Sequence, residues 1–214
     1  MENDWDITES YIQNKLAQVK EQFTDENYLS AFLSDAPRPA AVLVPLLRAP
    51  ITEYGNTAWH LLLTRRSDRL AEHRGQVAFP GGRCDPGDIS PEATALREAY
   101  EEIGLPPNEV KILGRLSAMW TITNYSITPV VAIVPWPFPI KLATQEVSRV
   151  FTIPLAWLAD SSHHEVRQRV IPSPYSLHAE NEIYPVIYFH PYDGEVLWGV
   201  SAEITKNLLR ILSG

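Results

Sequence analysis

The segment from residue 75 to residue 105, GQVAFPGGRCDPGDISPEATALREAYEEIGL, constrains the fold of this chain more than any other part of it. Its apolar start, residues 75–80, predicts a strand, and the glycines, prolines and aspartates that follow demand a loop. A helix is predicted from Pro91, because Ser90 is a good N-cap and proline is favoured at the first helical position. The helix should end at Gly104, since glycine is preferred after a last helical turn and two prolines follow. The segment therefore predicts a strand, a loop and a helix in direct succession.

Short apolar runs on both sides of this segment predict further strands. The expected strands are residues 40–48 and 58–66, and then segments near 110–119, 127–134, 149–153, 165–171, 183–190 and 195–198, before a last helix over about 201–213. This order of elements predicts an α/β fold, a sandwich built on a mixed β-sheet.

Residues 5 to about 35 are expected to form a helical arm. The sequence DITE offers Asp6 as an N-cap, and the apolar residues after it recur at helical spacing. The DAPRP segment should end the arm, because proline cannot continue a helix. We therefore expect an N-terminal helical arm of residues 1–36, accessory to a main domain of residues 37–214, and the arm could help to form a homodimer interface.

The charge of the chain limits its partners. With 26 Asp and Glu against 18 Lys and Arg, the formal net charge is −8, which argues against nucleic-acid binding. No apolar run approaches the roughly 20 residues that cross a bilayer, and the polar start MENDWDITES is unlike a signal peptide. A lone cysteine, Cys84, excludes an internal disulfide framework. We expect a cytoplasmic protein, in which any phosphate-bearing substrate must meet locally placed arginines or a metal.

Three glutamates crowd one face of the predicted helix. Glu98 lies three and four residues from Glu101 and Glu102, and like charges at this spacing destabilise an isolated helix. One interpretation is a solvated acidic face. The other is a site for a hard divalent cation such as Mg²⁺, which takes oxygen ligands. The Gly-Gly turn and acidic loop before the helix favour the second, because they can fold backbone carbonyls back over the carboxylates.

The same segment resembles the Nudix box, the signature of the Nudix hydrolase family. Its pattern is a glycine, five residues, a glutamate, seven residues, and then Arg-Glu-apolar-x-Glu-Glu-x-Gly-apolar. The matching positions are Gly82, Arg97, Glu98, Ala99, Glu101, Glu102, Gly104 and Leu105. Asp88 departs from the pattern, because it stands where the first glutamate belongs and eight residues separate it from Arg97.

The resemblance implies a Nudix-type α/β/α sandwich that hydrolyses a nucleoside diphosphate linked to another group, with Mg²⁺ or Mn²⁺. The metal ligands implied by the matching positions are a carbonyl of Gly81 or Gly82 and the carboxylates of Glu98, Glu101 and Glu102. Arg97 would orient these carboxylates.

The residues just upstream, LLLTRRSDRLAEHRGQVAFPGG, resemble the coenzyme A pyrophosphatase branch of that family. The branch typically has Leu-Leu-Thr-x-Arg-Ser, a leucine, and His-x-Gly-Gln ahead of Phe-Pro-Gly-Gly, and Ala71 departs from an arginine that often follows the leucine. This resemblance implies a small-molecule substrate, coenzyme A or its thioesters, cleaved to 3′,5′-ADP and (acyl-)phosphopantetheine. The alternatives are ADP-ribose, NADH or another nucleoside diphosphate derivative, and a non-catalytic module that binds a nucleotide.

Positive charge is concentrated in this upstream segment, where arginine forks would suit phosphate oxygens. The candidate substrate-binding residues are Arg65, Arg66, Arg69, His73 and Gln76. The alternative is that the arginines pair with nearby acids, and that the histidine and glutamine are structural.

The sequence offers several candidates for the general base that removes a proton from water. Glu98 could serve, as in some Nudix enzymes, and Glu146 sits where the family often places an acidic residue. Glu195 and Glu203 are further candidates.

Overall fold

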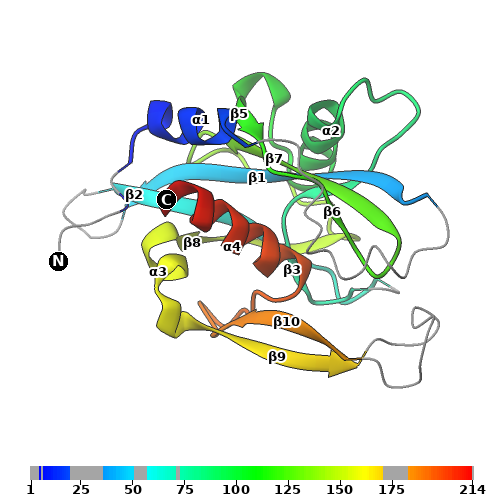
Figure 1. The fold of residues 1–214 in the computed structure, drawn as a ribbon. Coiled ribbons are helices and arrows are strands. Elements are labelled where there is room, and N and C mark those ends of the chain that lie inside the picture. Colours follow the sequence, from blue (N-terminus) through cyan, green and yellow to red (C-terminus); the bar gives the residue numbers. More distant parts are fainter. Residues whose placement is uncertain are drawn as a thin grey trace.

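The structure of the chain is a computed structural model that describes residues 5, 7–19, 36–50, 57–70, 73–170 and 183–213. Within these residues, eight strands form one mixed sheet (Figure 1). They are β1 (Arg38–Pro50), β2 (Thr57–Arg66), β3 (Val77–Ala78), β4 (Gly81–Arg83), β5 (Lys111–Arg115), β6 (Met119–Trp120), β7 (Tyr125–Ile133) and β8 (Val147–Pro154).

The long strand β1 organises the sheet. It pairs in parallel with β7 and antiparallel with β2 and β4. Strands β3 and β8 are antiparallel to β2, and β5 and β6 are antiparallel to β7. A sheet with one parallel pair among antiparallel pairs is mixed, as the sequence predicts.

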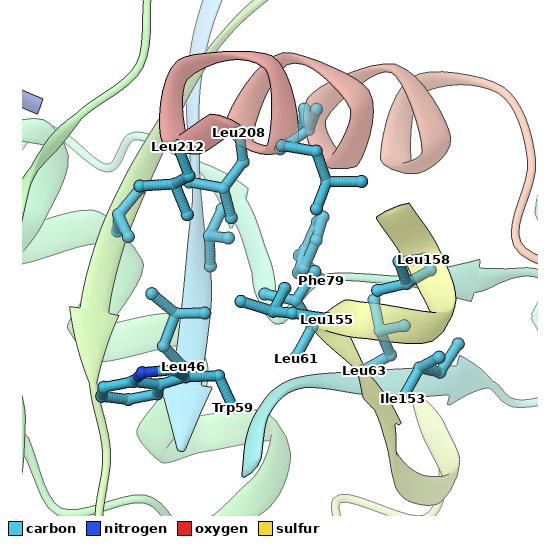
Figure 2. Close-up of a cluster of buried hydrophobic side chains, with 14 of the residues drawn as sticks. Leu46, Trp59, Leu61, Leu63, Phe79, Ile153, Leu155, Leu158, Leu208 and Leu212 are labelled. Atoms are coloured by element: carbon cyan, nitrogen blue, oxygen red, sulfur yellow. The ribbon is translucent and has the colours of Figure 1, made fainter. Parts of the chain in front are cut away.

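Helices cover both faces of this sheet. Alternate residues of β2 show the division, since Leu62 packs with α2 (Pro91–Ile103) whereas Leu61 and Leu63 pack with α3 (Leu155–Ala159) and α4 (Val200–Ser213). Each face therefore has its own apolar core. Figure 2 shows the core on the α3 and α4 side, where Leu208 and Leu212 of α4 lie above Leu46 of β1. Two apolar cores on opposite faces of one sheet confirm the predicted α/β/α sandwich.

The described part of the N-terminal arm packs into the core on the α4 side of the sheet. Helix α1 (Glu9–Ala17) begins after Thr8, whose side chain accepts a hydrogen bond from the Tyr11 N–H. The predicted N-cap at Asp6 is therefore wrong, because Thr8 is the residue whose side chain binds a free N–H group of the first helical turn. Ile12 and Leu16 are buried on the α4 side of the sheet. The rest of the expected arm, residues 1–4, 6 and 20–35, lies outside the described residues, and the boundary at residue 36 stays a prediction.

Three segments differ from the sequence-based expectation. Gly81–Arg83 forms β4 against β1 rather than a loop, since the missing side chains let two backbones approach closely. Residues 195–198 make isolated bridges instead of a strand. Helix α3 was not expected, because five residues are too few for a clear helical period.

The strands β9 (His164–Val170) and β10 (Ile183–Phe189) form a separate two-stranded ribbon beside α3 (Figure 1). Two short 3₁₀ turns, η2 (Pro107–Glu109) and η3 (Ser161–His163), complete the elements of the described residues. None of the helices in the described part of the chain is both long and apolar enough to span a membrane. The cytoplasmic location stays a prediction.

Candidate active site

Local sequence fixes the ends of α2, the helix that carries the glutamates. The Ser90 side chain accepts a hydrogen bond from the Ala93 N–H at 3.3 Å, and Pro91 occupies the first turn. Gly104 ends the helix with a φ of 74°, a left-handed conformation in which glycine avoids the cost paid by other residues. Both predicted helix ends are confirmed, so the register of the glutamates on the helix is set locally.

Arg97 is the centre of a hydrogen-bond network at the first half of α2. Its Nη1 donates to Glu98 Oε1 at 2.9 Å and to Glu101 Oε2 at 3.1 Å. Its Nη2 donates to the carbonyl oxygen of Arg83 at 3.0 Å, which ties α2 to β4. The guanidinium therefore fixes Glu98 and Glu101 relative to β4, which we call the glycine strand because it contains Gly81 and Gly82.

Asp88 completes this network from the loop before the helix. It accepts from Arg97 Nε at 3.2 Å and from Arg97 Nη2 at 2.9 Å, a two-point pair. The Asp85 N–H and the Thr94 hydroxyl also donate to Asp88, each at 2.9 Å. The hydrogen bonds from Arg97 hold the pKa of the Asp88 carboxyl well below its usual range. Asp88, which departs from the family pattern, thus holds Arg97 in place.

Glu98 lies against the glycine strand. A Cβ atom added to Gly82 would lie 2.4 Å from Glu98 Oε1, so only glycine leaves room for this carboxylate. Burial raises the pKa of Glu98, the Arg97 guanidinium opposes that rise, and the charges of Glu101 and Glu146 add to it. Burial therefore outweighs the neighbouring arginine in its effect on the pKa of Glu98.

Glu102 is the most buried carboxylate of the site, with 3% of the residue exposed. Its Oε2 atom is buried without a hydrogen-bond partner. Burial raises the pKa of Glu102 to about 8; the nearby Arg66 charge and the Gly81 backbone lower it, whereas Glu98 and Glu146 raise it further. A buried carboxylate oxygen without a partner is costly unless a cation or proton meets it.

Glu146 comes from a turn that is fastened to the end of α2. The Ala143 N–H donates to the Glu102 carbonyl oxygen at 2.9 Å, and the Ser67 N–H donates to the Glu146 carbonyl oxygen at 2.7 Å. The exposed Glu146 side chain acts electrostatically on both Glu98 and Glu102. The structure therefore brings these three glutamates together.

The donor set fits a hard divalent cation. Within the part of the chain that the structure describes, no three His, Cys, Asp or Glu side chains are arranged as a ready-made metal cage. Mg²⁺ does not need one, because it usually keeps waters and binds one or two carboxylates with substrate phosphates. The unpartnered oxygen of Glu102, with Glu98 beside it, supplies such a pair. A cation there would compete with Arg97 for Glu98.

The predicted substrate-binding residues separate into two groups. Arg66 lies near Glu102 on the α2 side, and its Nε atom is buried without a hydrogen-bond partner. Arg65 instead pairs with Asp68 and lies 3.6 Å from Glu195, on the other face of the sheet. Strand alternation explains the separation, because successive side chains of β2 point to opposite faces.

The other candidates lie on the loop that follows β2. His73 Nδ1 lies 3.0 Å from Gln76 Oε1, so these two side chains share a hydrogen bond. His73 adopts a left-handed φ of 56° at the turn. Arg69 is exposed, and its N–H donates to the Ser67 hydroxyl oxygen at 3.3 Å. The loop can therefore present Arg69 to a ligand, whereas His73 and Gln76 are already paired.

Two of the candidate bases lie apart from the glutamate cluster. Glu195 is within 3.6 Å of Arg65 and 3.4 Å of Arg149, on the α4 side of the sheet. Glu203 belongs to α4 itself. The remaining candidates are Glu98 and Glu146.

Sequence reasoning missed Thr94 and the Arg83 carbonyl, both of which hold the Asp88–Arg97 pair. Thr94 carried a signal that could have been used. It precedes Arg97 and Glu98 by three and four residues, so it shares their helix face.

Comparison with known proteins agrees with the site. A family model described as the NUDIX domain matches residues 37–173. The chain is 37% identical over 202 residues to a protein of Yersinia pestis (strain Pestoides F) described as an uncharacterized Nudix hydrolase, NudL, covering 94% of this chain and 91% of that protein. A protein of Yersinia pseudotuberculosis serotype O:1b with the same description matches equally well.

Solved structures resemble the chain less closely. A MutT/nudix family protein from Enterococcus faecalis has a TM-score of 0.48 and 16% identity, covering 96% of this chain and 75% of that one. A C. elegans Ap4A hydrolase complex has a TM-score of 0.43 and 22% identity, covering 54% of this chain and 80% of that one. Family membership rests on the sequence matches instead. The chain belongs to the Nudix hydrolases, enzymes that act on nucleoside diphosphate derivatives and generally use divalent metal ions.

Proposed function

We propose that this enzyme hydrolyses the diphosphate of coenzyme A, or of its thioesters, to 3′,5′-ADP and (acyl-)phosphopantetheine, with Mg²⁺ or Mn²⁺. The observation that carries the proposal is the convergence of Glu98, Glu102 and Glu146 beside the glycine strand, with Arg66 next to Glu102. The resemblance of the segment from residue 61 to residue 82 to the coenzyme A branch supports the choice of substrate.

Glu98, Glu101 and Glu102 would hold the metal, together with a carbonyl of Gly81 or Gly82. When bound, the cation supplies neutralisation of the diphosphate and a lower pKa for the attacking water. Arg97, held by Asp88, keeps Glu98 and Glu101 in position. Water attacks one phosphorus atom, and the bond from that phosphorus to the bridging oxygen breaks. Attack at either phosphorus gives the same two products.

Glu146 is the base that we assign to this step. Its carboxylate is exposed at the edge of the cluster, whereas Arg97 already occupies Glu98. The water proton passes to the Glu146 carboxylate as the oxygen bonds to phosphorus. Arg66 and Arg69 would bind the substrate, because an arginine suits phosphate oxygens. His73 and Gln76 would contact the substrate only after giving up the hydrogen bond that they share. The homodimer suggested by the N-terminal arm stays a prediction.

The test is a substrate panel with Mg²⁺ and, separately, Mn²⁺: CoA, acetyl-CoA, ADP-ribose, NADH and a diadenosine polyphosphate. We expect kcat/KM to be highest for CoA or its thioester. A higher value for ADP-ribose or NADH would overturn the choice of substrate but keep the Nudix chemistry. No turnover of any member would indicate a nucleotide-binding module.

The base is tested with Glu146→Gln at saturating metal. Loss of a general base should lower kcat by roughly 10²–10⁴-fold. A loss of only a few-fold would return the role to Glu98.

A further inference from the structure

Arg65 has too many protein partners to act as a phosphate ligand. Its Nη1 donates to Asp68 Oδ2 at 3.0 Å and to the Ser148 hydroxyl at 3.1 Å, and its Nη2 donates to Asp68 Oδ1 at 3.0 Å. Its Nε faces Glu195 Oε2 at 3.6 Å. The guanidinium is thus directed to two carboxylates and a hydroxyl of the protein.

The charge around Arg65 also disfavours an anionic ligand. Arg149, the other arginine of this cluster, pairs with Asp193 and lies 3.4 Å from Glu195. Two arginines therefore face the three carboxylates of Asp68, Asp193 and Glu195, so the cluster carries a net negative charge. This net charge disfavours a phosphate beside Arg65. Arg66 differs in its hydrogen bonding, because its buried Nε atom has no partner in the protein.

The partners of Arg65 lie next to the turn that carries Glu146. Ser148, two residues after Glu146, receives a hydrogen bond from Arg65 and donates one back to the Arg65 carbonyl oxygen at 3.1 Å. Asp68 follows Ser67, whose N–H donates to the Glu146 carbonyl oxygen at 2.7 Å. Arg65 therefore binds Ser148 on one side of Glu146 and Asp68, next to the Ser67 that holds the Glu146 carbonyl oxygen, on the other. We call these contacts the clamp, and they lie on the face of the sheet opposite the site.

We infer that Arg65 is a positioning residue that sets the place of Glu146, and not a substrate ligand. The inference rests on the proposed function, in which Glu146 accepts the water proton. The Ala143 N–H fastens the start of the turn to the end of α2. At the end of the turn, the Arg65–Ser148 bonds add to the backbone pairing of β2 with β8. A side chain held between two such anchors keeps its distance to Glu98 and Glu102.

Loss of the clamp should act on turnover and spare binding. A shift of a catalytic group by about 1 Å can cost on the order of 10²-fold in rate. Because Ala143 and Ser67 still hold the turn, we expect Arg65→Gln to lower kcat by about 10-fold or more and to leave KM within about 2-fold. Ser148→Ala removes the bond from Arg65 Nη1 and also the bond to the Arg65 carbonyl oxygen, so it should lower kcat as well and leave KM unchanged.

The experiment combines steady-state kinetics on the best panel substrate with amide hydrogen exchange of peptides covering residues 143–148. In Arg65→Gln and Ser148→Ala, exchange at this turn should become faster while the melting temperature changes little. Arg66→Gln is the matched comparison and should raise KM. Arg167→Gln removes an arginine that pairs with Glu165 on β9 and should leave both readouts unchanged.

Two results would overturn the inference. One is a raised KM with unchanged kcat in Arg65→Gln, which would make Arg65 a substrate ligand. The other is unchanged exchange at residues 143–148, which would show that Arg65 does not hold the turn. The exchange measurement needs no substrate, so it decides the positioning role even if the panel disproves the substrate or the activity.

Discussion

Gly82 offers a sharp test of the site, because its missing side chain is what admits Glu98. In Gly82→Ala, the new Cβ would lie 2.4 Å from Glu98 Oε1 and 2.6 Å from Glu98 Cδ. Ordinary contact begins at 3.4 Å, so the carboxylate must move by about 1 Å. Such a displacement can cost on the order of 10²-fold in rate.

The fold should survive this substitution. The Gly82 backbone does not need a positive φ, since none is found there, and a strand accepts alanine. Glu98 can swing aside, although it then loses its bond to Arg97. We therefore expect kcat to fall by about 10²-fold with a melting temperature close to that of the unchanged protein. Steady-state kinetics with Mg²⁺ and thermal unfolding measure the two quantities.

Gly87→Ala is the matched control. It lies in the loop after β4, and an added Cβ there would meet nothing within 4 Å. It should keep full activity. If Gly82→Ala also kept activity within a few-fold, Glu98 would not need its observed position and the site as described would be wrong.

Three further predictions concern stability and the metal. Asp88→Asn should lower the urea midpoint of unfolding at pH 7, and the difference from the unchanged protein should shrink as the pH falls below about 4. The reason is that the pKa of Asp88 in the folded state lies below the unfolded value of about 3.9. The stabilisation by the Asp88 carboxylate is therefore present above that value and lost on acidification. Equal midpoints at pH 7 would contradict this. Ile12→Ala should cost about 2–5 kcal/mol of unfolding free energy, because Ile12 is fully buried; a loss below 1 kcal/mol would show that α1 is not part of the cooperative unit. Glu102→Gln should raise the melting temperature of the metal-free protein above about pH 8, because the Glu102 carboxyl, with its pKa raised to about 8, is there a buried charge. It should also abolish the stabilisation by added Mg²⁺, and a retained Mg²⁺ effect would remove Glu102 from the metal ligands.

Local signals account for the parts of the fold that the sequence predicted well. The ends of α2 depend on Ser90, Pro91 and Gly104, each of which acts within one turn of the helix. Strands β1, β2 and β7 are long apolar runs, which made their existence clear. Helix α1 begins later than predicted, because Thr8 takes the N-cap position that the sequence suggested for Asp6.

Long-range contacts account for what could not be predicted. Strand β4 exists because Gly81 and Gly82 approach β1, and a glycine pair by itself indicates a turn. The family resemblance named Glu146 as a candidate base, but the Ala143 N–H and Ser67 N–H bonds that hold its turn join segments far apart in the sequence. The separation of Arg65 from Arg66 was within reach, since the period of a strand sends neighbours to opposite faces.

The most direct test of the central claim is chromatographic identification of the products formed from CoA and Mg²⁺ by the unchanged enzyme and by Glu98→Gln. We predict equal amounts of 3′,5′-ADP and phosphopantetheine from the unchanged enzyme, and a rate at least about 10²-fold lower in the variant. Intact CoA after incubation with the unchanged enzyme, or the same rate in the variant, would contradict the account.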